Sequence, residues 1–241
     1  FLGSADLSRA KLDKADLEGA NLTRAVLSGA SLSHATLDGA TLTEADLRSA
    51  KLVGAQLEGA DLGAANLEGA QLGHAEMGEC YLGGAKLAAA DLASADLASA
   101  NLEEADLTGA TLSDANLEKV NAPKANFSHA VLGGANASQA KLDGAVFAGT
   151  DMRKAKFEGA SFYGALLTGA KLHGVDLSPS VVSSAFADWV DASADADGSN
   201  RVALADLGAA LTGIGRAARR YFGPGDVLRN AALEFGDKTS V

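Results

Sequence analysis

The sequence contains almost no cysteine, and it lacks long apolar runs. Cys80 is the only cysteine among 241 residues, which excludes a disulfide within the chain. No apolar run approaches the ~18–20 residues that a membrane-spanning helix requires, so the sequence predicts no membrane span. No targeting segment is recognisable either. The chain begins with Phe1, and Leu2 already follows the repeat described below, so we expect a processed or truncated N-terminus.

Positive charge is also scarce. There are 20 Lys and Arg residues against 31 Asp and Glu residues, and the formal net charge is −11. Residues 1–180 contribute −9 of this charge, from 14 basic and 23 acidic residues. A protein that binds nucleic acid directly needs a basic patch that neutralises phosphates. The charge balance therefore argues against direct nucleic-acid binding.

Residue types suited to catalysis are sparse and dispersed. The chain has four histidines, which are His34, His74, His129 and His173. No Ser-His-Asp or Cys-His constellation surrounds them, so the sequence offers no activated nucleophile. We predict that the protein is not an enzyme.

What the sequence has instead is a repeat of five residues. Every fifth residue from Ala5 is alanine and every fifth residue from Leu7 is leucine, through 35 consecutive units that end at Pro179. The alanine position departs from alanine at Cys80, Val120, Thr150 and Val175. The leucine position departs from leucine at Met77, Ala122, Phe127, Ala137, Phe147, Met152, Phe157 and Phe162. A repeat this regular determines the architecture of the chain that carries it.

A period of five fits neither a helix nor a continuous strand. Five helical residues advance by about 500°, so successive leucines would spiral around the helix. In a continuous strand, an odd period places successive leucines on opposite faces. The chain must therefore turn once in every unit, so that all leucines and alanines point inward.

Glycine marks the expected corner. We number the positions of a unit from its alanine, so that leucine is third and the corner falls at the fourth and fifth positions. The fifth position is Gly in 15 of the 35 units, as a type II turn requires at its third residue, where φ is positive. Pro123 occupies a fourth position, where type II turns accept proline.

These units resemble the motif A-(D/N)-L-x-x of the pentapeptide-repeat family over residues 5–179. The second position is Asp or Asn in many units, among them Asp6, Asp16, Asn21, Asp46, Asp61, Asn66, Asp91, Asp96, Asn101 and Asp106. The resemblance implies an all-β, right-handed parallel β-helix of square cross-section with four units per coil. The period alone leaves three or four sides open. With four, the 35 units form 8.75 coils, so the rod domain of residues 1–179 is ~42 Å long at about 4.8 Å per coil.

Four units per coil stack residues that are 20 apart. One side then carries an acidic column of Glu18, Asp38, Glu58, Glu118 and Glu158, with Asp16, Glu76 and Asp96 beside it. This column is either a solvated surface that keeps the rod soluble or an acidic binding face. His34 and His74 share another column but lie two coils apart, roughly 10 Å, which is too far to share a metal. Cys80 is expected to be a buried small hydrophobe.

The repeat stops after Pro179, and we expect a small α-helical module over residues 180–241. Hydrophobic residues between Val181 and Asp191 have helical spacing, which predicts a helix that places Phe186 and Trp189 over the open end of the rod. A further helix is expected after the break at Gly223-Pro224-Gly225, where Asp226 suits its N-cap.

Residues 186–215 resemble an EF-hand, with a twelve-residue loop from Asp195 to Asp206. The resemblance implies a calcium site whose ligands are Asp195, Asp197, Ser199, the Arg201 carbonyl and Asp206. Asp206 is shorter than the usual Glu, and Ala203 has no side-chain donor, so weak affinity is expected. Asn200 replaces the usual Gly and is the next best residue for positive φ. The alternative is an Asx-rich loop between two capping helices.

The sequence favours a non-enzymatic scaffold that docks on a protein assembly through a rigid rod, with calcium bound at its helical end. Members of the family are common in cyanobacteria and plastids, including the thylakoid lumen. The alternative function is a DNA-mimicking inhibitor or protector of DNA gyrase, because quinolone-resistance members of the family resemble duplex DNA and bind gyrase. The partner in either case is a protein or a multisubunit assembly.

Overall fold

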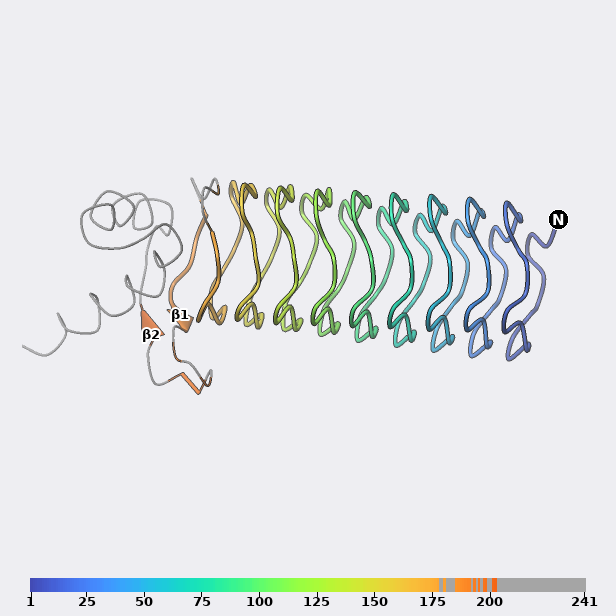
Figure 1. Cartoon of the computed structure of the whole chain (residues 1–241), viewed down its shortest axis with the longest axis horizontal. Helices are drawn as coiled ribbons and strands as arrows, with labels where there is room; N and C mark the ends of the chain where they lie inside the picture. Colours follow the sequence, from blue (N-terminus) through green and yellow to red (C-terminus); the bar gives the residue numbers. More distant parts are fainter. Residues whose placement is uncertain are drawn as a thin grey trace, which may run out of the picture.

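The chain winds into a straight rod of stacked coils (Figure 1). The computed structural model describes residues 1–177, 180, 185–191, 193, 195, 197–198 and 201–202. Second-position residues pair in parallel with the residue 20 further along, from Asp6 with Val26 to Lys156 with Asp176. This register confirms four units per coil and a β-helical solenoid.

Backbone hydrogen bonds hold each unit to the coils on both sides of it. In the unit of Leu47, the Asp46 amide donates to the Ala25 carbonyl of the preceding coil at 2.9 Å. The Leu47 amide donates to the Asn66 carbonyl of the following coil at 2.7 Å. The Ala50 amide donates back to the Leu47 carbonyl at 3.0 Å and closes the turn. The ladder therefore consists of short paired rungs separated by corners.

The fifth position adopts a left-handed backbone throughout the rod. All 35 residues at this position from Ser4 to Gly174 have φ between +52° and +76°, as the type II turn predicts. Only 15 of them are glycine, so 20 other residues accept a conformation that costs about 1–2 kcal/mol each. The repeated ladder thus imposes the turn even where the residue disfavours it.

The core is one continuous column along the axis. From Leu22 to Val175, every alanine and leucine position is at most 4% exposed. Leu7, Leu12 and Leu17 in the first coil are only partly buried. The described residues thus confirm the inward direction of both positions.

Aromatic residues enter the core in the last third of the rod. Phe127 and Phe147 stack in neighbouring coils with ring centroids 5.0 Å apart and planes within 1°. Phe162 meets Phe157 edge to face with centroids 5.1 Å apart. These geometries are the favourable arrangements of aromatic pairs, and they confirm that the phenylalanines belong to the core.

The coil continues beyond the recognisable repeat. Phe186 pairs with Leu166 and Asp191 pairs with Lys171, both in the 20-residue register of the rod. The helix predicted between Val181 and Asp191 is therefore wrong over residues 185–191, which are extended. Ala185, Ala187 and Val190 occupy the inward positions of the repeat and are buried, so pairing with the exposed edge of the last coil overrides the helical spacing.

Two short strands follow at this end of the rod. Strand β1, Val190–Asp191, pairs antiparallel with strand β2, Arg201–Val202, so that Val190 faces Val202. The remainder of the predicted helical module, residues 181–184, 192, 194, 196, 199–200 and 203–241, lies outside the described residues. None of the described residues forms a helix long and apolar enough to cross a membrane.

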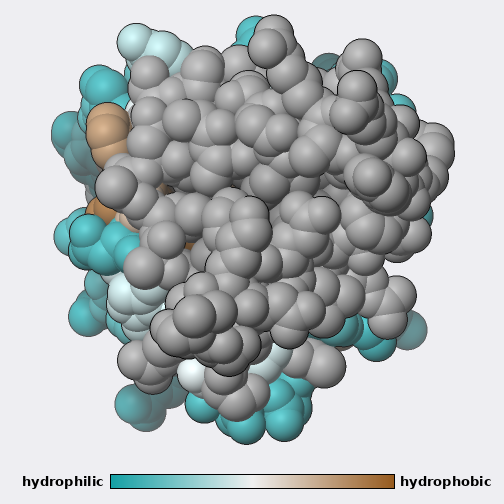
Figure 2. Space-filling model, turned by 90° about the vertical axis from the view of Figure 1, so that its left-hand side faces the viewer, coloured by the Kyte–Doolittle hydropathy of each residue, from teal (hydrophilic) through white to brown (hydrophobic). Residues whose placement is uncertain are grey.

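The surface also becomes more apolar at this end. Val146, Leu166 and Phe186 form one column over three coils, at second positions that elsewhere hold mostly polar residues. Leu166 is 39% exposed and Phe186 is 53% exposed. Figure 2 views the molecule from this end and shows brown, hydrophobic atoms at its left edge among teal, hydrophilic ones.

Candidate interaction surface

The rod presents four flat faces, one for each unit of a coil. We call the face that contains residues 16–19 and every segment 20 residues further the acidic face. Its ten acidic residues are Asp16, Glu18, Asp38, Glu58, Glu76, Glu79, Asp96, Glu118, Glu158 and Asp176. Its two basic residues are Lys119 and Lys156. This face therefore has a net charge of −8, almost all of the −9 that residues 1–180 carry.

The structure brings together the acidic residues that the sequence analysis placed in a column. It adds two that the analysis missed, Glu79 and Asp176, which the same 20-residue arithmetic would have found. The face that contains residues 21–24 has five acidic and three basic residues, and the two remaining faces are close to neutral. The charge is thus concentrated on one side of the rod.

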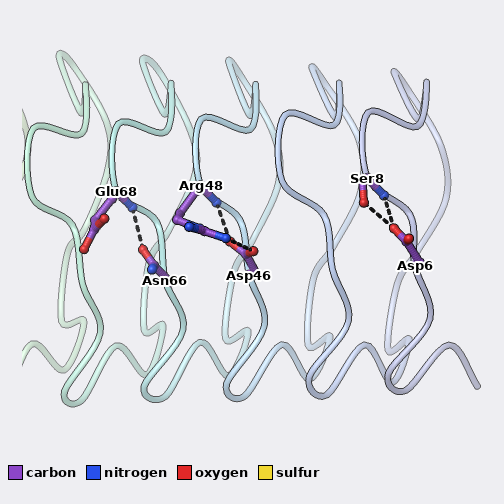
Figure 3. Close-up of polar contacts among 6 residues, drawn as sticks. All are labelled: Asp6, Ser8, Asp46, Arg48, Asn66 and Glu68. Atoms are coloured by element: carbon purple, nitrogen blue, oxygen red, sulfur yellow. Dashed lines mark hydrogen bonds and ion pairs between the residues drawn. The ribbon is translucent and has the colours of Figure 1, made fainter.

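Many acidic side chains at second positions have a structural role. The carboxylate of Asp46 accepts a hydrogen bond from the Arg48 amide at 3.2 Å, and the Asn66 side chain accepts one from the Glu68 amide at 3.1 Å (Figure 3). Asp6 holds the Ser8 amide in the same way at 3.0 Å. This recurring bond to the residue two further on explains why the motif requires Asp or Asn.

Glutamates at the fourth position of the acidic face form fewer interactions with neighbouring residues. Glu118 pairs with Lys119 at 3.0 Å, whereas no ion pair among the described residues involves Glu18, Glu58 or Glu158. The Glu58 amide is held by the Asp38 carboxylate at 2.8 Å, which fixes the backbone beneath that side chain. These carboxylates therefore project from a rigid frame and face solvent.

Four basic residues on the other faces, Arg24, Arg48, Lys124 and Arg153, are in ion pairs. Arg24 pairs with Glu44 one coil away at 2.8 Å, and its hydrogen bond lowers the pKa of that carboxyl. Lys124 pairs with Glu104 at 2.9 Å. Burial alone would raise the pKa of Asp151, but hydrogen bonds from Arg153 outweigh it and lower the pKa. This pairing on the other faces sharpens the contrast with the acidic face.

The histidines and the cysteine do not form a reactive centre. The His34 ring lies against Gly54, which separates it from His74 in the same column. Within the described part of the chain, no three His, Cys, Asp or Glu side chains are grouped as metal ligands. The Cys80 thiol is buried and donates to the Leu57 carbonyl at 2.8 Å, and burial raises its pKa to about 12. Cys80 is a core residue, as predicted.

Three of the five predicted calcium ligands, Asp195, Asp197 and Arg201, are among the described residues. Asp195 and Asp197 are exposed on the connection between β1 and β2, and Arg201 belongs to β2. Ser199 and Asp206 lie outside the described residues. Asp191, which the sequence analysis did not single out, is buried, and its carboxylate accepts hydrogen bonds from the Gly198 amide at 3.0 Å and the Ser193 amide at 2.9 Å.

Comparison with known proteins supports the repeat architecture. The family described as Pentapeptide repeats matches eight overlapping segments between residues 5 and 178. HetL, a pentapeptide repeat protein involved in heterocyst differentiation regulation from the cyanobacterium Nostoc sp. strain PCC 7120, is 32% identical over 81% of this chain and 91% of its own, with a TM-score of 0.41. A search of curated proteins gave no match.

Two further solved structures are similar. QnrB1, a plasmid-mediated fluoroquinolone resistance protein, is 21% identical over 74% of this chain and 87% of its own, with a TM-score of 0.51. A pentapeptide repeat protein of the Arabidopsis thaliana thylakoid lumen is 26% identical over 39% of this chain and 63% of its own, with a TM-score of 0.31. The likeness to QnrB1 shows a shared fold.

Proposed function

The chain belongs to the pentapeptide-repeat family, and we propose that it is a non-enzymatic scaffold that docks on a protein assembly through its acidic face. The observation that carries this proposal is the net charge of −8 on one of four faces. Like charges about 5 Å apart repel, so a column of carboxylates lowers stability unless a positive surface faces it. A basic protein surface would remove that repulsion.

Rigidity supports docking through this face. The backbone ladder holds the acidic side chains on one plane before any partner arrives, so little backbone order remains to be gained on binding. Complementary charge would also accelerate association, and the rate would fall as salt screens it. The proposed partner is therefore a protein or multisubunit assembly with a basic surface.

A matched pair of triple variants tests this function. Glu18→Gln, Glu58→Gln and Glu158→Gln together remove three charges from the acidic face. Glu68→Gln, Asp91→Asn and Asp114→Asn remove three charges from the two nearly neutral faces and serve as the control. Partners captured from the native source should be lost with the first triple and retained with the second. Equal capture by both triples would reject docking through the acidic face.

The second candidate is a DNA-mimicking inhibitor or protector of DNA gyrase. It is favoured by the length of the acidic face, which follows the rod from Asp16 to Asp176. Duplex DNA carries phosphates on two strands around its axis, whereas this rod concentrates charge on one side. We therefore expect no inhibition of gyrase supercoiling at micromolar protein. Inhibition that weakens with salt and disappears in the acidic-face triple would favour mimicry over the scaffold.

We also propose that the C-terminal segment binds calcium through Asp195, Asp197, Ser199, the Arg201 carbonyl and Asp206. Support comes from the two exposed carboxylates, which lie on one connection whose ends are paired in β1 and β2. Oxygen donors of this kind suit calcium, which would neutralise the converging carboxylates.

Calorimetry with calcium or chelator tests this site. At a hundredfold excess over Kd, binding to the folded state alone stabilises by about 2.7 kcal/mol. A transition of the C-terminal segment should move with calcium in the wild type and stay in place in Asp195→Ala, while the rod transition remains constant in both. Absence of binding heat at millimolar calcium would reduce this segment to a polar loop.

A further inference from the structure

One exposed aromatic side chain lies against two glycines on the face next to the acidic face. We call the face that contains residues 21–24 and every segment 20 further the tyrosine face, because it carries Tyr81 and Tyr163. A Cβ built on Gly63 would stand 2.8 Å from Tyr81 Cε1, and one built on Gly83 would stand 2.6 Å from Tyr81 Cζ. The ring therefore contacts the positions of both glycines, one coil apart, and Tyr81 is 48% exposed.

The two glycines are present for the ring and not for the backbone. Both occupy the fourth position of a unit, where φ is not left-handed. At the same position elsewhere, a Cβ on Gly73 or Gly78 would meet only a backbone carbonyl at 3.7 or 3.8 Å, which is ordinary contact. Tyr81 atoms are the nearest atoms to the Cβ position at both Gly63 and Gly83, so any larger residue at either position would collide with the ring. Gly63 and Gly83 thus leave room for the Tyr81 ring, and we call this place the seat of Tyr81.

Carboxylates border this seat on both sides. A Cβ built on Gly63 would lie 2.8 Å from Tyr81 Cε1 and 3.1 Å from Asp61 Oδ1. The Asp61 oxygen is therefore at most about 6 Å from the ring, which is the sum of these two distances. The Gly63 amide and the Thr43 hydroxyl both donate to Asp61, at 2.9 and 3.1 Å, and they hold its carboxylate in place. Exposed Glu103 lies one coil further along the same face.

Positive charge on this face is remote from Tyr81. Lys141 lies three coils after Tyr81, and the other two basic residues are in ion pairs. Arg24 lies three coils before Tyr81 and bonds Glu44, and Lys124 lies two coils after it and bonds Glu104. The ring therefore faces solvent in a negative environment. An exposed aromatic face with neighbouring carboxylates suits a planar cation, which stacks on the ring and donates hydrogen bonds at its edge.

We propose that Tyr81 is the position where an arginine side chain of the partner docks. The guanidinium stacks on the ring, and the Asp61 and Glu103 carboxylates compensate its charge. Arginine fits better than lysine because its planar fork can stack and bond carboxylates at once. The inference rests on the proposed scaffold function, and it extends the docking surface from the acidic face around the corner at Glu79 and Cys80 onto the tyrosine face.

The test titrates the full chain with a hexapeptide of alternating glycine and arginine. NMR signals of the tyrosine ring protons report binding. Tyr81 signals should shift to saturation while those of Tyr163 stay constant. Tyr81→Ala should weaken binding about three- to fivefold, which corresponds to the 0.5–1 kcal/mol of an exposed cation–π contact. Gly83→Ala should weaken it similarly, because the new Cβ lifts the ring. Tyr81→Phe and the control Gly78→Ala should change it less than twofold, and thermal midpoints should confirm that all variants fold.

The remaining outcomes of this test would each reject a specific part of the proposal. Equal binding of the glycine–lysine peptide would overturn stacking by arginine. Ring shifts caused by a neutral oligosaccharide such as maltohexaose, without any caused by the arginine peptide, would overturn the cationic partner. If the acidic-face triple loses the peptide and Tyr81→Ala does not, Tyr81 is not the docking position and the acidic face stands. If only the Tyr81 variants weaken binding, docking through the acidic face fails instead.

Discussion

Two parts of the rod share one backbone but fill it differently. In residues 22–121 the leucine position holds leucine in all units but one, which has Met77. In residues 122–177 it alternates between Phe, Leu, Met and Ala, yet the parallel register of 20 residues continues without a slip. We call these parts the leucine coils and the phenylalanine coils. Their comparison teaches that ladder and turn set the register, while the core accepts residues of different size at the leucine position.

In one of the phenylalanine coils, a large residue shares its layer with small ones. The coil that contains Phe127 has Ala122 and Ala137 at two of its other leucine positions. Close-packed interiors tolerate such exchanges when the total volume is conserved. Thr150 shows the same adaptation at an alanine position, because its buried hydroxyl donates to the Phe127 carbonyl at 2.6 Å.

The largest effect is expected from a charge within the leucine coils. Leu67→Asp places a carboxylate at a position that is 1% exposed and surrounded by apolar side chains. The cost of an unpaired buried charge should reach several kcal/mol, about 4 or more, and unfold neighbouring coils. Thermal and urea denaturation measure it, with Glu68→Gln as the surface control. An unchanged thermal midpoint would contradict the inward assignment.

A moderate effect is expected when a phenylalanine coil is given a leucine. Phe147→Leu removes the stacked ring from Phe127 and leaves a cavity, so we expect a loss of about 1–2 kcal/mol. If layer volume is the controlling quantity, Phe127→Leu combined with Ala137→Leu should be more stable than Phe127→Leu alone. Urea denaturation of the three variants decides this, and a double variant that is the least stable would reject volume compensation.

Alkaline pH should destabilise the protein through Cys80 but not through Thr150. These two polar residues occupy alanine positions in the leucine coils and in the phenylalanine coils, respectively. Burial raises the thiol pKa from 9.0 to about 12, so above pH 9 the unfolded chain releases a proton that the folded chain keeps. Stability contributed by Cys80 is complete below pH 9 and declines as pH rises towards 12. The thermal midpoint of the wild type should therefore fall relative to Cys80→Ala between pH 8 and 10.5, whereas Thr150→Ala should show no such relative change. Parallel pH curves for all three would contradict the buried thiol.

The smallest effects should be equal in both parts. Gly59 in the leucine coils and Gly164 in the phenylalanine coils have φ of +63° and +67°, and an added Cβ meets nothing within 4 Å. Alanine at either site should destabilise by about 1 kcal/mol through backbone conformation alone. Gly78→Ala, which has room and no left-handed φ, should cost close to nothing. Unequal losses at Gly59 and Gly164 would show that the core composition influences the turn.

The five-residue period alone determined most of the fold, because it is a local property that every unit repeats. It predicted a turn in each unit, the inward alanines and leucines, and the place of positive φ, and all three are observed. The acidic column also followed from the sequence once residues 20 apart were stacked, although Glu79 and Asp176 were omitted.

Contacts between coils decided the rest. Residues 185–191 lack the motif and have helical spacing, yet the free edge of the preceding coil pairs with them, because backbone groups at an edge gain more from a partner strand than from an isolated helix. The seat of Tyr81 depends on Gly63, 18 residues earlier in sequence but one coil away in space. Such pairs come together only when the chain closes a full coil, so a local pattern did not reveal them.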